Sequence, residues 1–487
     1  RYSLDNAVPP AMNYSPLPLG FEMDKQQFPI VWSFPEEVKI PAKREQLAFY
    51  SVAELAYLLR SRKISSTDLT KIYLARLKKY GDTLHCVISL TEDLALKQAA
   101  KADRELRAGL WRGPLHGIPY GVKDLLSVPG YKTTWGAGPF KDQDRGEEIA
   151  TVVKKLEAAG AVLVAKLSMG ALAMGDVWFE GTTRNPWDLE QGSSGSSAGS
   201  ASATAAALVA FAIGTETWGS IVSPATRCSV TGLRPTYGRV SRAGAMALSW
   251  SMDKIGPICR TAQDCAMVFD VIRGEDGIDL TVNNASFNYY GEIDLSQLKI
   301  GYFKSFFETS YRNKSADSVS LEVLKSLGAE LIAVEFETEI PVSALSIILT
   351  AEAGAAFDEL TRSNQDTLLT RQIRQAWPNI FRASRFIPAA DYINANRIRF
   401  QLLQEFDAMM QEFDLIVTPS YGGNQLLATN LTGHPCVVVP NGLQSEGPPA
   451  SISFLGNLFD EATILAVAKK YQEATAFDEA HPAMFMP

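Results

Sequence analysis

Between residues 192 and 207 the chain contains only small residues, in the order Gly-Ser-Ser-Gly-Ser-Ser-Ala-Gly-Ser-Ala-Ser-Ala-Thr-Ala-Ala-Ala. A flexible Gly/Ser linker is one interpretation of such a run. The run, however, grades into alanine-rich helix formers and then into the apolar stretch 208–213. We therefore predict a tightly packed loop that leads into a buried helix, where the backbone passes close to a ligand or another segment.

Short apolar runs alternate with helical patterns along much of the chain. Ser51 and Glu54 form a capping-box pattern, a helix is expected over 66–80, and 149–166 is typical of a helix followed by a buried strand. Further helical patterns cover 317–327 and 461–472. The remaining candidate strands are 298–303, 331–334, 414–419, 436–439 and 450–454. This alternation predicts an α/β protein with a mixed sheet.

The chain shows no internal repeat and no linker that would divide its core. Residues 1–45 carry seven prolines and are predicted to form an irregular N-terminal arm, while 46–487 are predicted to form one catalytic domain. Since the sequence begins at Arg1 and not at Met, we expect that either a leader was removed or the sequence was trimmed. We expect a soluble protein and leave open whether it is cytoplasmic, or secreted or periplasmic after loss of a leader.

Composition excludes several classes of protein. The 46 Lys and Arg against 54 Asp and Glu give a net charge of −8, which disfavours a nucleic-acid partner. No apolar run is long enough to span a membrane. The five cysteines are scattered without a CxxC pair, and the four histidines lack ligand spacing. We expect neither a metal nor an organic cofactor.

Three stretches together resemble one family of enzymes. They are the small-residue run, Gly214-Thr-Glu-Thr-Trp-Gly-Ser-Ile-Val-Ser-Pro224, and Gly113-Pro-Leu-His-Gly-Ile-Pro-Tyr-Gly-Val-Lys-Asp124. Ser196 and Ser220 also keep the family's separation between its two serines. The sequence resembles the amidase signature family of serine hydrolases over about residues 46–475, and Asp253-Lys-Ile-Gly-Pro257 is a further match. The resemblance implies a single large domain in which helices surround a central, mixed, twisted sheet.

The resemblance assigns a catalytic relay. It implies that Ser220 is the nucleophile, that Ser196 is a bridging serine in a cis peptide with Gly195, and that Lys123 is the base. The backbone N–H groups of Thr217, Trp218, Gly219 and Ser220 would form the oxyanion hole. A lysine can act as a base only when neutral, so burial or nearby positive charge must lower its pKa from about 10.4.

Residues of the substrate pocket are harder to assign. Many family members carry Gly at the position of Trp218, so this ring is expected to shape or narrow the pocket. We expect pocket residues from 170–179 and 340–430, and Trp178, Phe179 and Trp218 favour an apolar or aromatic substrate. Asp124, His116, His434 and Cys228 are expected to have structural roles.

Several functions fit the relay. The main hypothesis is a stand-alone amidase that cleaves a small-molecule amide to an acid and an amine or ammonia through an acyl-serine. The alternatives are the glutamine-hydrolysing A subunit of a tRNA-dependent amidotransferase, a carbamate or ester hydrolase, and an inactive binding protein on the same fold. Many relatives form dimers, so a homodimer is also open.

A second serine-hydrolase pattern occurs in the same run. Residues 195–199 match G-x-S-x-G, the nucleophile elbow of α/β-hydrolases, which would make Ser197 the nucleophile. That elbow must follow a hydrophobic strand, and residues 185–193 do not resemble one. We reject this interpretation.

Overall fold

A computed structural model describes residues 14–443 and 449–487 of the chain. Within these residues eleven strands form one mixed sheet, in the order β1-β3-β2-β8-β10-β9-β14-β15-β13-β11-β12. The strands are β1 (Val87–Leu90), β2 (Pro119–Lys123), β3 (Val162–Leu167), β8 (Phe211–Glu216), β9 (Thr231–Arg234), β10 (Lys254–Cys259), β11 (Lys299–Phe303), β12 (Glu330–Val334), β13 (Leu415–Pro419), β14 (Cys436–Pro440) and β15 (Ser451–Gly456). The prediction of a single-domain α/β fold with a mixed sheet is confirmed.

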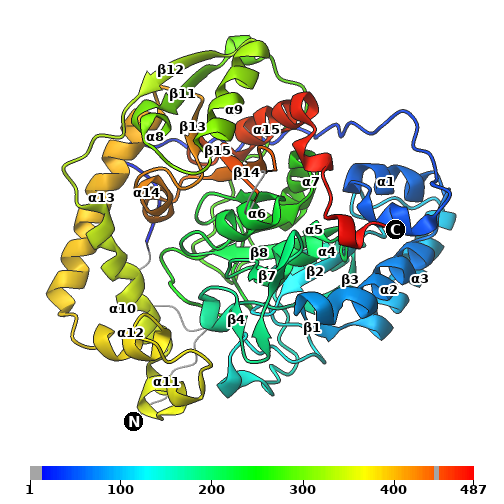
Figure 1. The fold of residues 1–487 in the computed structure, drawn as a ribbon, viewed down its shortest axis with the longest axis horizontal. Coiled ribbons are helices and arrows are strands. Elements are labelled where there is room, and N and C mark those ends of the chain that lie inside the picture. Colours follow the sequence, from blue (N-terminus) through cyan, green and yellow to red (C-terminus); the bar gives the residue numbers. More distant parts are fainter. Residues whose placement is uncertain (1–13, 444–448) are drawn as a thin grey trace.

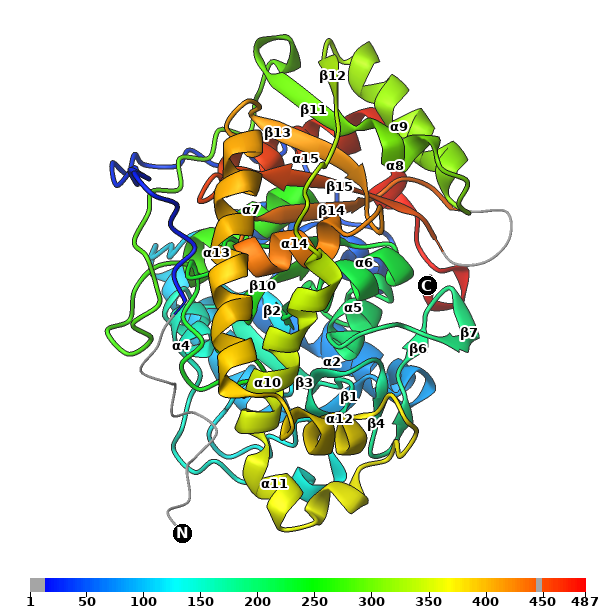
Figure 2. The same ribbon diagram turned by 90° about the vertical axis from the view of Figure 1, so that its left-hand side faces the viewer.

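Helices surround this sheet (Figure 1). They are α1 (Val52–Arg60), α2 (Ser66–Leu84), α3 (Glu92–Arg107), α4 (Thr151–Ala158), α5 (Ala198–Ala205), α6 (Val222–Cys228), α7 (Ala262–Ile272), α8 (Lys304–Glu308), α9 (Lys314–Ser326), α10 (Ile347–Ala356), α11 (Asp358–Arg362), α12 (Trp377–Ser384), α13 (Ala389–Met410), α14 (Gln425–Thr432) and α15 (Glu461–Thr475). Helices α10, α12 and α13 lie together on the side that faces the viewer in Figure 2. Two small hairpins pair β4 (Val177–Trp178) with β5 (Gly181–Thr182), and β6 (Arg184–Asn185) with β7 (Asp188–Gly192).

The small-residue run contains the buried helix that the sequence predicts. Helix α5 is buried at every residue and packs against β2, β3, β8 and β10. Its small side chains permit this close approach. A Cβ on Gly199 would lie only 2.5 Å from the backbone nitrogen of Ser168, so only glycine fits there.

One predicted helix boundary needs correction. The capping box at Ser51 and Glu54 is present, but the helix expected to end near Tyr80 continues to Leu84 and ends at His85 in a left-handed conformation. Gly81 therefore lies inside the helix and does not end it. A Cβ at that position would lie 3.0 Å from the Val87 side chain of β1. Close packing against the sheet therefore explains this glycine.

The described part of the N-terminal arm runs over the surface of the domain. Residues 14–43 form no helix or strand, and a 3-10 helix (Arg44–Phe49) precedes α1. The arm is held by side-chain contacts, including hydrogen bonds from Gln27 to the 287–288 backbone and side chains. The first part of the predicted arm, residues 1–13, lies outside the described residues, and its boundary at residue 45 stays a prediction. No helix in the described ranges has the length and apolar character needed to cross a membrane.

Candidate active site

The sheet brings Lys123 next to the segment that carries Ser220. Strands β2 and β8 are parallel neighbours, with Val122 opposite Ile213. Their carboxyl ends therefore meet at the same edge of the sheet. Lys123 is the last residue of β2, and residues 217–220 follow directly on β8.

Lys123 is fully buried among hydroxyl and carbonyl groups. Its Nζ lies 2.7 Å from Ser196 Oγ, 3.0 Å from Ser197 Oγ, and 2.9 Å and 3.3 Å from Thr215 Oγ1 and O. Burial lowers the pKa of Lys123 to about 7, against the opposing effect of the negative charges on Asp253 and Glu216. A substantial fraction of this lysine is therefore neutral near pH 7, as a base requires.

The two adjacent serines have different hydrogen-bond roles. Ser197 Oγ donates to Thr215 O at 3.0 Å and accepts from Thr215 N at 3.1 Å. Its proton is therefore committed to the backbone, and it can only accept from Lys123. Ser196 is the neighbour left to give its proton to a neutral Lys123. This geometry agrees with the rejection of Ser197 as a nucleophile.

The peptide bond between Gly195 and Ser196 is cis, at the position that the family resemblance named. A Cβ at Gly195 would lie 1.8 Å from the carbonyl oxygen of Gly175, so no other residue fits. The N–H of Gly170 donates to Ser196 O at 3.3 Å. The 170–175 segment thus packs directly against this bond.

Ser220 lies beside this pair of serines at the end of a loop with free donors. The N–H of Ser197 donates to Ser220 O at 3.2 Å. Among the described residues, no acceptor receives the backbone N–H groups of 217–220. Gly219 has φ +82°, a conformation that glycine adopts without strain. Such a run of unpaired N–H groups favours an anionic oxygen.

Glu216 holds the loop of residues 217–220 in place. Its fully buried carboxylate accepts from Ile221 N and Val222 N at 2.8 and 2.9 Å, from Asn430 Nδ2 at 2.7 Å and from Arg234 at 3.1 Å. Burial alone raises its pKa, but Arg234 and these donors outweigh that effect and lower the pKa of Glu216. The carboxylate stays charged and anchors both ends of residues 217–220.

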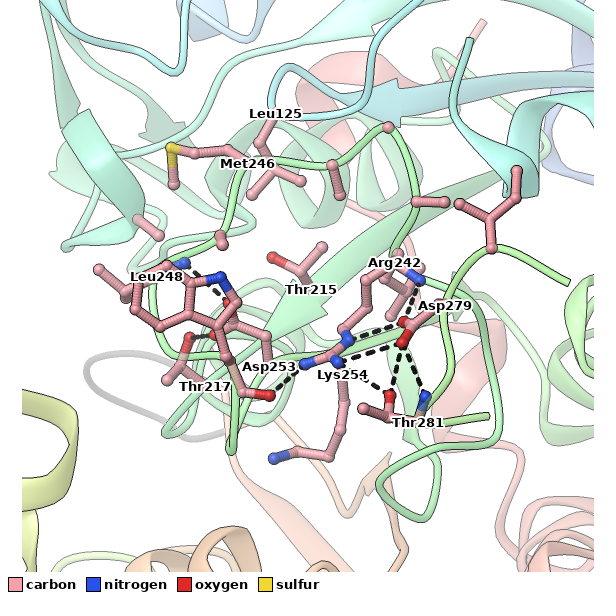
Figure 3. Close-up of a pocket in the computed structure, with 18 of the residues that line it drawn as sticks. Leu125, Thr215, Thr217, Arg242, Met246, Leu248, Asp253, Lys254, Asp279 and Thr281 are labelled. Carbon is pink, nitrogen blue, oxygen red and sulfur yellow. Dashed lines mark hydrogen bonds and ion pairs between the residues drawn. The ribbon is translucent and has the colours of Figure 1, made fainter. Parts of the chain in front are cut away.

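Figure 3 shows the residues that line a cavity of about 240 Å³, among them Thr215, which also contacts Lys123. Thr217 lines it as well, whereas Lys123, Ser196 and Ser220 do not line the cavity. Two of its charged wall groups pair with each other, since Arg242 lies 3.0 Å from Asp279. The rest of the lining is Leu125, Ala173, residues 243–248, Trp250, Asp253–Ile255, Ile278, Leu280 and Thr281. The volume is smaller than the roughly 300–1,000 Å³ of pockets for drug-sized ligands.

The three predicted pocket aromatics do not line this cavity. Trp178 is buried in the β4–β5 hairpin, where its ring centroid lies 4.9 Å from that of Phe179. Phe179 is held by its N–H, which donates to Gly136 O at 3.2 Å. Trp218 is 45% exposed on the loop of residues 217–220. Of the two stretches expected to supply the pocket, 170–179 contributes Ala173 and 340–430 contributes no lining residue.

Sequence reasoning missed the stretch that does form the cavity wall, residues 242–255 and 278–281. Part of it, the motif from Asp253 to Pro257, carries the family resemblance, which assigned it no role in a pocket. Thr217 Oγ1 donates to Asp253 Oδ1 at 2.6 Å, which joins the cavity wall to the loop of residues 217–220. A short acidic residue before an apolar strand was the available signal, but it does not reveal a contact across 36 residues.

The other singled-out residues have local partners. Asp124 forms a buried ion pair with Lys166 at 2.9 Å, and His116 contacts Glu105 at 3.0 Å. His434 contacts Thr432 Oγ1 at 2.9 Å, and the buried Cys228 donates from Sγ to Ser193 O. In the described ranges no cluster of His, Cys, Asp or Glu could hold a metal ion.

Comparison with known proteins agrees with this geometry. The amidase family model matches residues 68–425. The A subunit of glutamyl-tRNA(Gln) amidotransferase from Coxiella burnetii is 32% identical over 481 aligned positions, covering 89% of this chain and 99% of the relative. Its counterpart from Thermoanaerobacter pseudethanolicus is 33% identical, with 89% and 98% covered.

Solved structures share the fold. The peptide amidase of Stenotrophomonas maltophilia superposes with a TM-score of 0.78 at 29% identity, covering 88% of this chain and 97% of that one. An amidase family protein of Bacillus anthracis gives a TM-score of 0.80 at 27% identity, covering 90% and 93%. The chain therefore belongs to the amidase family, whose enzymes hydrolyse C–N bonds.

Proposed function

We propose that this chain is a stand-alone amidase that cleaves a small-molecule carboxylic amide through an acyl-Ser220 intermediate. The observation that carries the proposal is the 2.7 Å contact between Ser196 Oγ and the buried Lys123 Nζ. Ser197 and Thr215 occupy the donors of a neutral lysine, so its lone pair faces the Ser196 hydroxyl. That arrangement suits a base acting through a bridging serine.

The proton relay runs in two directions. Ser220 Oγ attacks the amide carbon while its proton passes to Ser196 Oγ, whose own proton passes to Lys123 Nζ. The tetrahedral intermediate then breaks its C–N bond, and the leaving nitrogen receives a proton from Ser196, which regains one from Lys123. Water attacks the acyl-Ser220 ester by the same relay, and the acid leaves as Ser220 recovers its proton. Each half-reaction returns Lys123 to its neutral form.

The N–H groups of 217–220 would stabilise the oxyanion in both tetrahedral intermediates. Their unpaired state supports this role, because donors that are already aimed need no reorganisation as charge develops. Glu216 holds the loop by accepting from the two N–H groups that follow Ser220.

The main alternative is glutamine hydrolysis as part of an amidotransferase. It is favoured by the two relatives that are named as A subunits of glutamyl-tRNA(Gln) amidotransferase. The purified chain should be assayed alone for ammonia release from L-glutamine, from neutral amides such as phenylacetamide, and for cleavage of a carbamate and an ester. Turnover of a neutral amide without a partner supports the stand-alone amidase. If the chain hydrolyses only glutamine among these substrates, and a partner protein increases that rate, the result would favour the alternative.

The nucleophile can be identified independently of the substrate. A fluorophosphonate probe followed by peptide mass spectrometry should place the adduct on Ser220, and Lys123→Ala should remove it. An adduct on Ser197 would instead support the nucleophile-elbow interpretation. Absence of any adduct on well-folded protein would contradict the proposed serine mechanism.

A further inference from the structure

Residues 248–253, called here the wall segment, connect the cavity to residues 217–220, called here the oxyanion loop because of their proposed role. Leu248, Trp250 and Asp253 line the cavity, and the segment leads directly into β10 (Figure 3). Two carboxylates hold it by hydrogen bonds, one from its own Asp253 and one from Glu352 on α10. Its position therefore depends on residues far from it in the sequence.

The first carboxylate is that of Asp253, at the end of the wall segment. Asp253 Oδ2 accepts from Leu248 N at 2.8 Å and from Ser249 N at 3.0 Å, which closes the segment into a loop. Asp253 Oδ1 accepts from Thr217 Oγ1 at 2.6 Å. A shift of the wall segment therefore moves Thr217, whose N–H is one of the unpaired donors.

The second carboxylate is that of Glu352 on α10, which is only 5% exposed. Glu352 Oε2 accepts from Ser249 Oγ at 2.6 Å and from Ser251 N at 3.0 Å. Glu352 Oε1 accepts from Ser251 Oγ at 2.6 Å and from the Tyr392 hydroxyl of α13 at 2.9 Å. Four donors thus occupy the four acceptor sites that a carboxylate offers.

The network continues from the wall segment towards the N-terminal arm. Arg399 of α13, which is 2% exposed, donates from Nη1 to Ser251 Oγ at 2.8 Å. Its guanidinium carbon lies 3.7 Å from the ring centroid of Tyr14. Ser251 therefore bridges a buried carboxylate and a buried guanidinium. Buried networks of this kind are rigid when every member is satisfied and costly when one is removed.

We propose that Glu352 is a positioning residue for the oxyanion loop, acting through the wall segment, Asp253 and Thr217. The proposal rests on the proposed function, because it assumes that the N–H groups of 217–220 stabilise the oxyanion. Glu352 itself contacts none of Lys123, Ser196 and Ser220, and it does not line the cavity. Its effect on the reaction passes through the backbone that it holds.

Glu352→Gln is the informative substitution because it keeps the size of the side chain. A glutamine offers one acceptor oxygen instead of two, and its NH₂ group faces donors. The wall segment should loosen as a result. Asp103→Asn is the matched control, since the Asp103 carboxylate is also buried and accepts from Ser66 N, Thr67 N and Thr67 Oγ1, away from the site.

Hydrogen exchange measures how firmly Glu352 holds the wall segment, and it needs no turnover. Peptides covering 245–255 should exchange faster in Glu352→Gln than in wild type, and should be unchanged in Asp103→Asn. The rate constant for fluorophosphonate labelling of Ser220, and kcat/KM for an amide substrate, should fall at least about tenfold in Glu352→Gln alone, since a misplacement of ~1 Å can cost on the order of 100-fold in rate. KM should change less than kcat, because the loop acts on the intermediate.

The acid limb of the profile of kcat/KM against pH is a second readout. Its position depends on the pKa of Lys123 and not on the stability of the protein. The charges on Asp253 and Glu216 raise the pKa of Lys123 against the effect of burial. If Asp253 moves away with the wall segment, that pKa falls and the limb shifts to lower pH. Asp103→Asn should keep the wild-type limb even where it lowers the melting temperature.

The outcomes are distinct. If residues 245–255 exchange faster in Glu352→Gln while the labelling rate of Ser220 and the acid limb stay unchanged, the positioning role is overturned. Exchange equal to that of wild type would overturn it as well. If Glu352→Gln does not fold, Ser249→Ala removes a single donor and should show the same effects in smaller degree. Failure of wild-type Ser220 to label would contradict the proposed function and with it the positioning role, while exchange would still report whether Glu352 holds the segment.

Discussion

Lys123 Nζ lies 2.7 Å from the hydroxyl oxygen of Ser196, a residue 73 positions away, and neither side chain is more than 1% exposed. Burial explains why a lysine can serve in this position. Removing the ammonium from water disfavours its charged form, so the same packing that hides the residue also makes it a base near neutral pH. The structure thus couples the position of the residue to its chemistry.

Substitution of Lys123 by Ala should lower kcat/KM by about 10²–10⁴-fold, the range expected for loss of a general base. Ser220→Ala should abolish turnover, and Ser196→Ala should be severe but leakier, because a water molecule can bridge in its place. Steady-state kinetics on an amide substrate measures all three. The control is Lys132→Ala, since Lys132 is exposed and pairs only with Asp142 at 2.6 Å. Wild-type activity in Lys123→Ala would contradict the relay.

The pH dependence of kcat/KM should show an acid limb near pH 7. Lys123 must be neutral to accept a proton, and its pKa is lowered to about 7. Below that pH the rate should fall about tenfold per unit as Lys123 becomes protonated. Above it, the limb should level off. In Asp253→Asn the loss of a negative charge should move the limb to lower pH, and a shift to higher pH would contradict this electrostatic account.

Glu216→Gln should reduce both stability and activity. Breaking the buried pair with Arg234 leaves a guanidinium without its countercharge, at a cost of about 3–5 kcal/mol. In the double variant Glu216→Met with Arg234→Met, the melting temperature should partly recover, because neither charge remains buried. Activity should not recover, since the loop has lost the acceptor of Ile221 and Val222 N–H.

A variant of a second buried ion pair separates the loss of stability from the loss of activity. Glu461 pairs with Arg239 at 3.1 Å and contacts none of the proposed relay residues. Glu461→Gln should lower the melting temperature comparably while the folded enzyme keeps its kcat. If both Gln variants lost activity only in proportion to unfolding, the loop-anchoring role of Glu216 would be wrong.

Gly195→Ala should disrupt the site or the fold, because its Cβ would lie 1.8 Å from Gly175 O. Backbone atoms on both sides would have to move, and Ser196 would move with them. Gly291→Ala is a suitable comparison, since its Cβ would meet no atom closer than 3.7 Å. Thermal unfolding and labelling of Ser220 measure the difference, and a Gly195→Ala protein with wild-type labelling would rule out this packing argument.

Trp218→Gly should widen access to the oxyanion loop. The ring is 45% exposed and stands on the loop between Thr217 and Gly219. We expect KM to fall for bulky amides, with little change in kcat for a small primary amide. A series of N-substituted amides of one acid tests this. Equal KM changes across the series would show that Trp218 does not select by size.

The sequence was enough to propose the relay because its motifs are local. Lys123, Ser196 and Ser220 each sit in a stretch whose residue types are restricted by backbone contacts, such as Gly195 against Gly175 and Gly199 against Ser168. Local periodicity likewise predicted β11, β12, β13, β14 and β15 to within two residues, but it did not predict β2, β8 and β10. The family resemblance also implied the cis bond at Gly195–Ser196.

Other elements contradict their local signals. Pro257 lies in β10, which is paired on both sides by β8 and β9, although a proline disfavours a central strand. Trp178 and Phe179 lie in and beside the β4–β5 hairpin and do not line the cavity, so their place in a substrate pocket stays a prediction.

The sequence by itself determined the fold class, the family, and the three residues proposed for the relay, because each depends on short stretches of chain. Only the tertiary structure decided which residues surround them. The contacts of Glu352 with Ser249 and Ser251 span about a hundred positions, and Asp253 reaches Thr217 from the neighbouring strand. Burial and hydrogen-bond pairing across such separations arise only when the whole sheet assembles, and burial is also what lowers the pKa of Lys123.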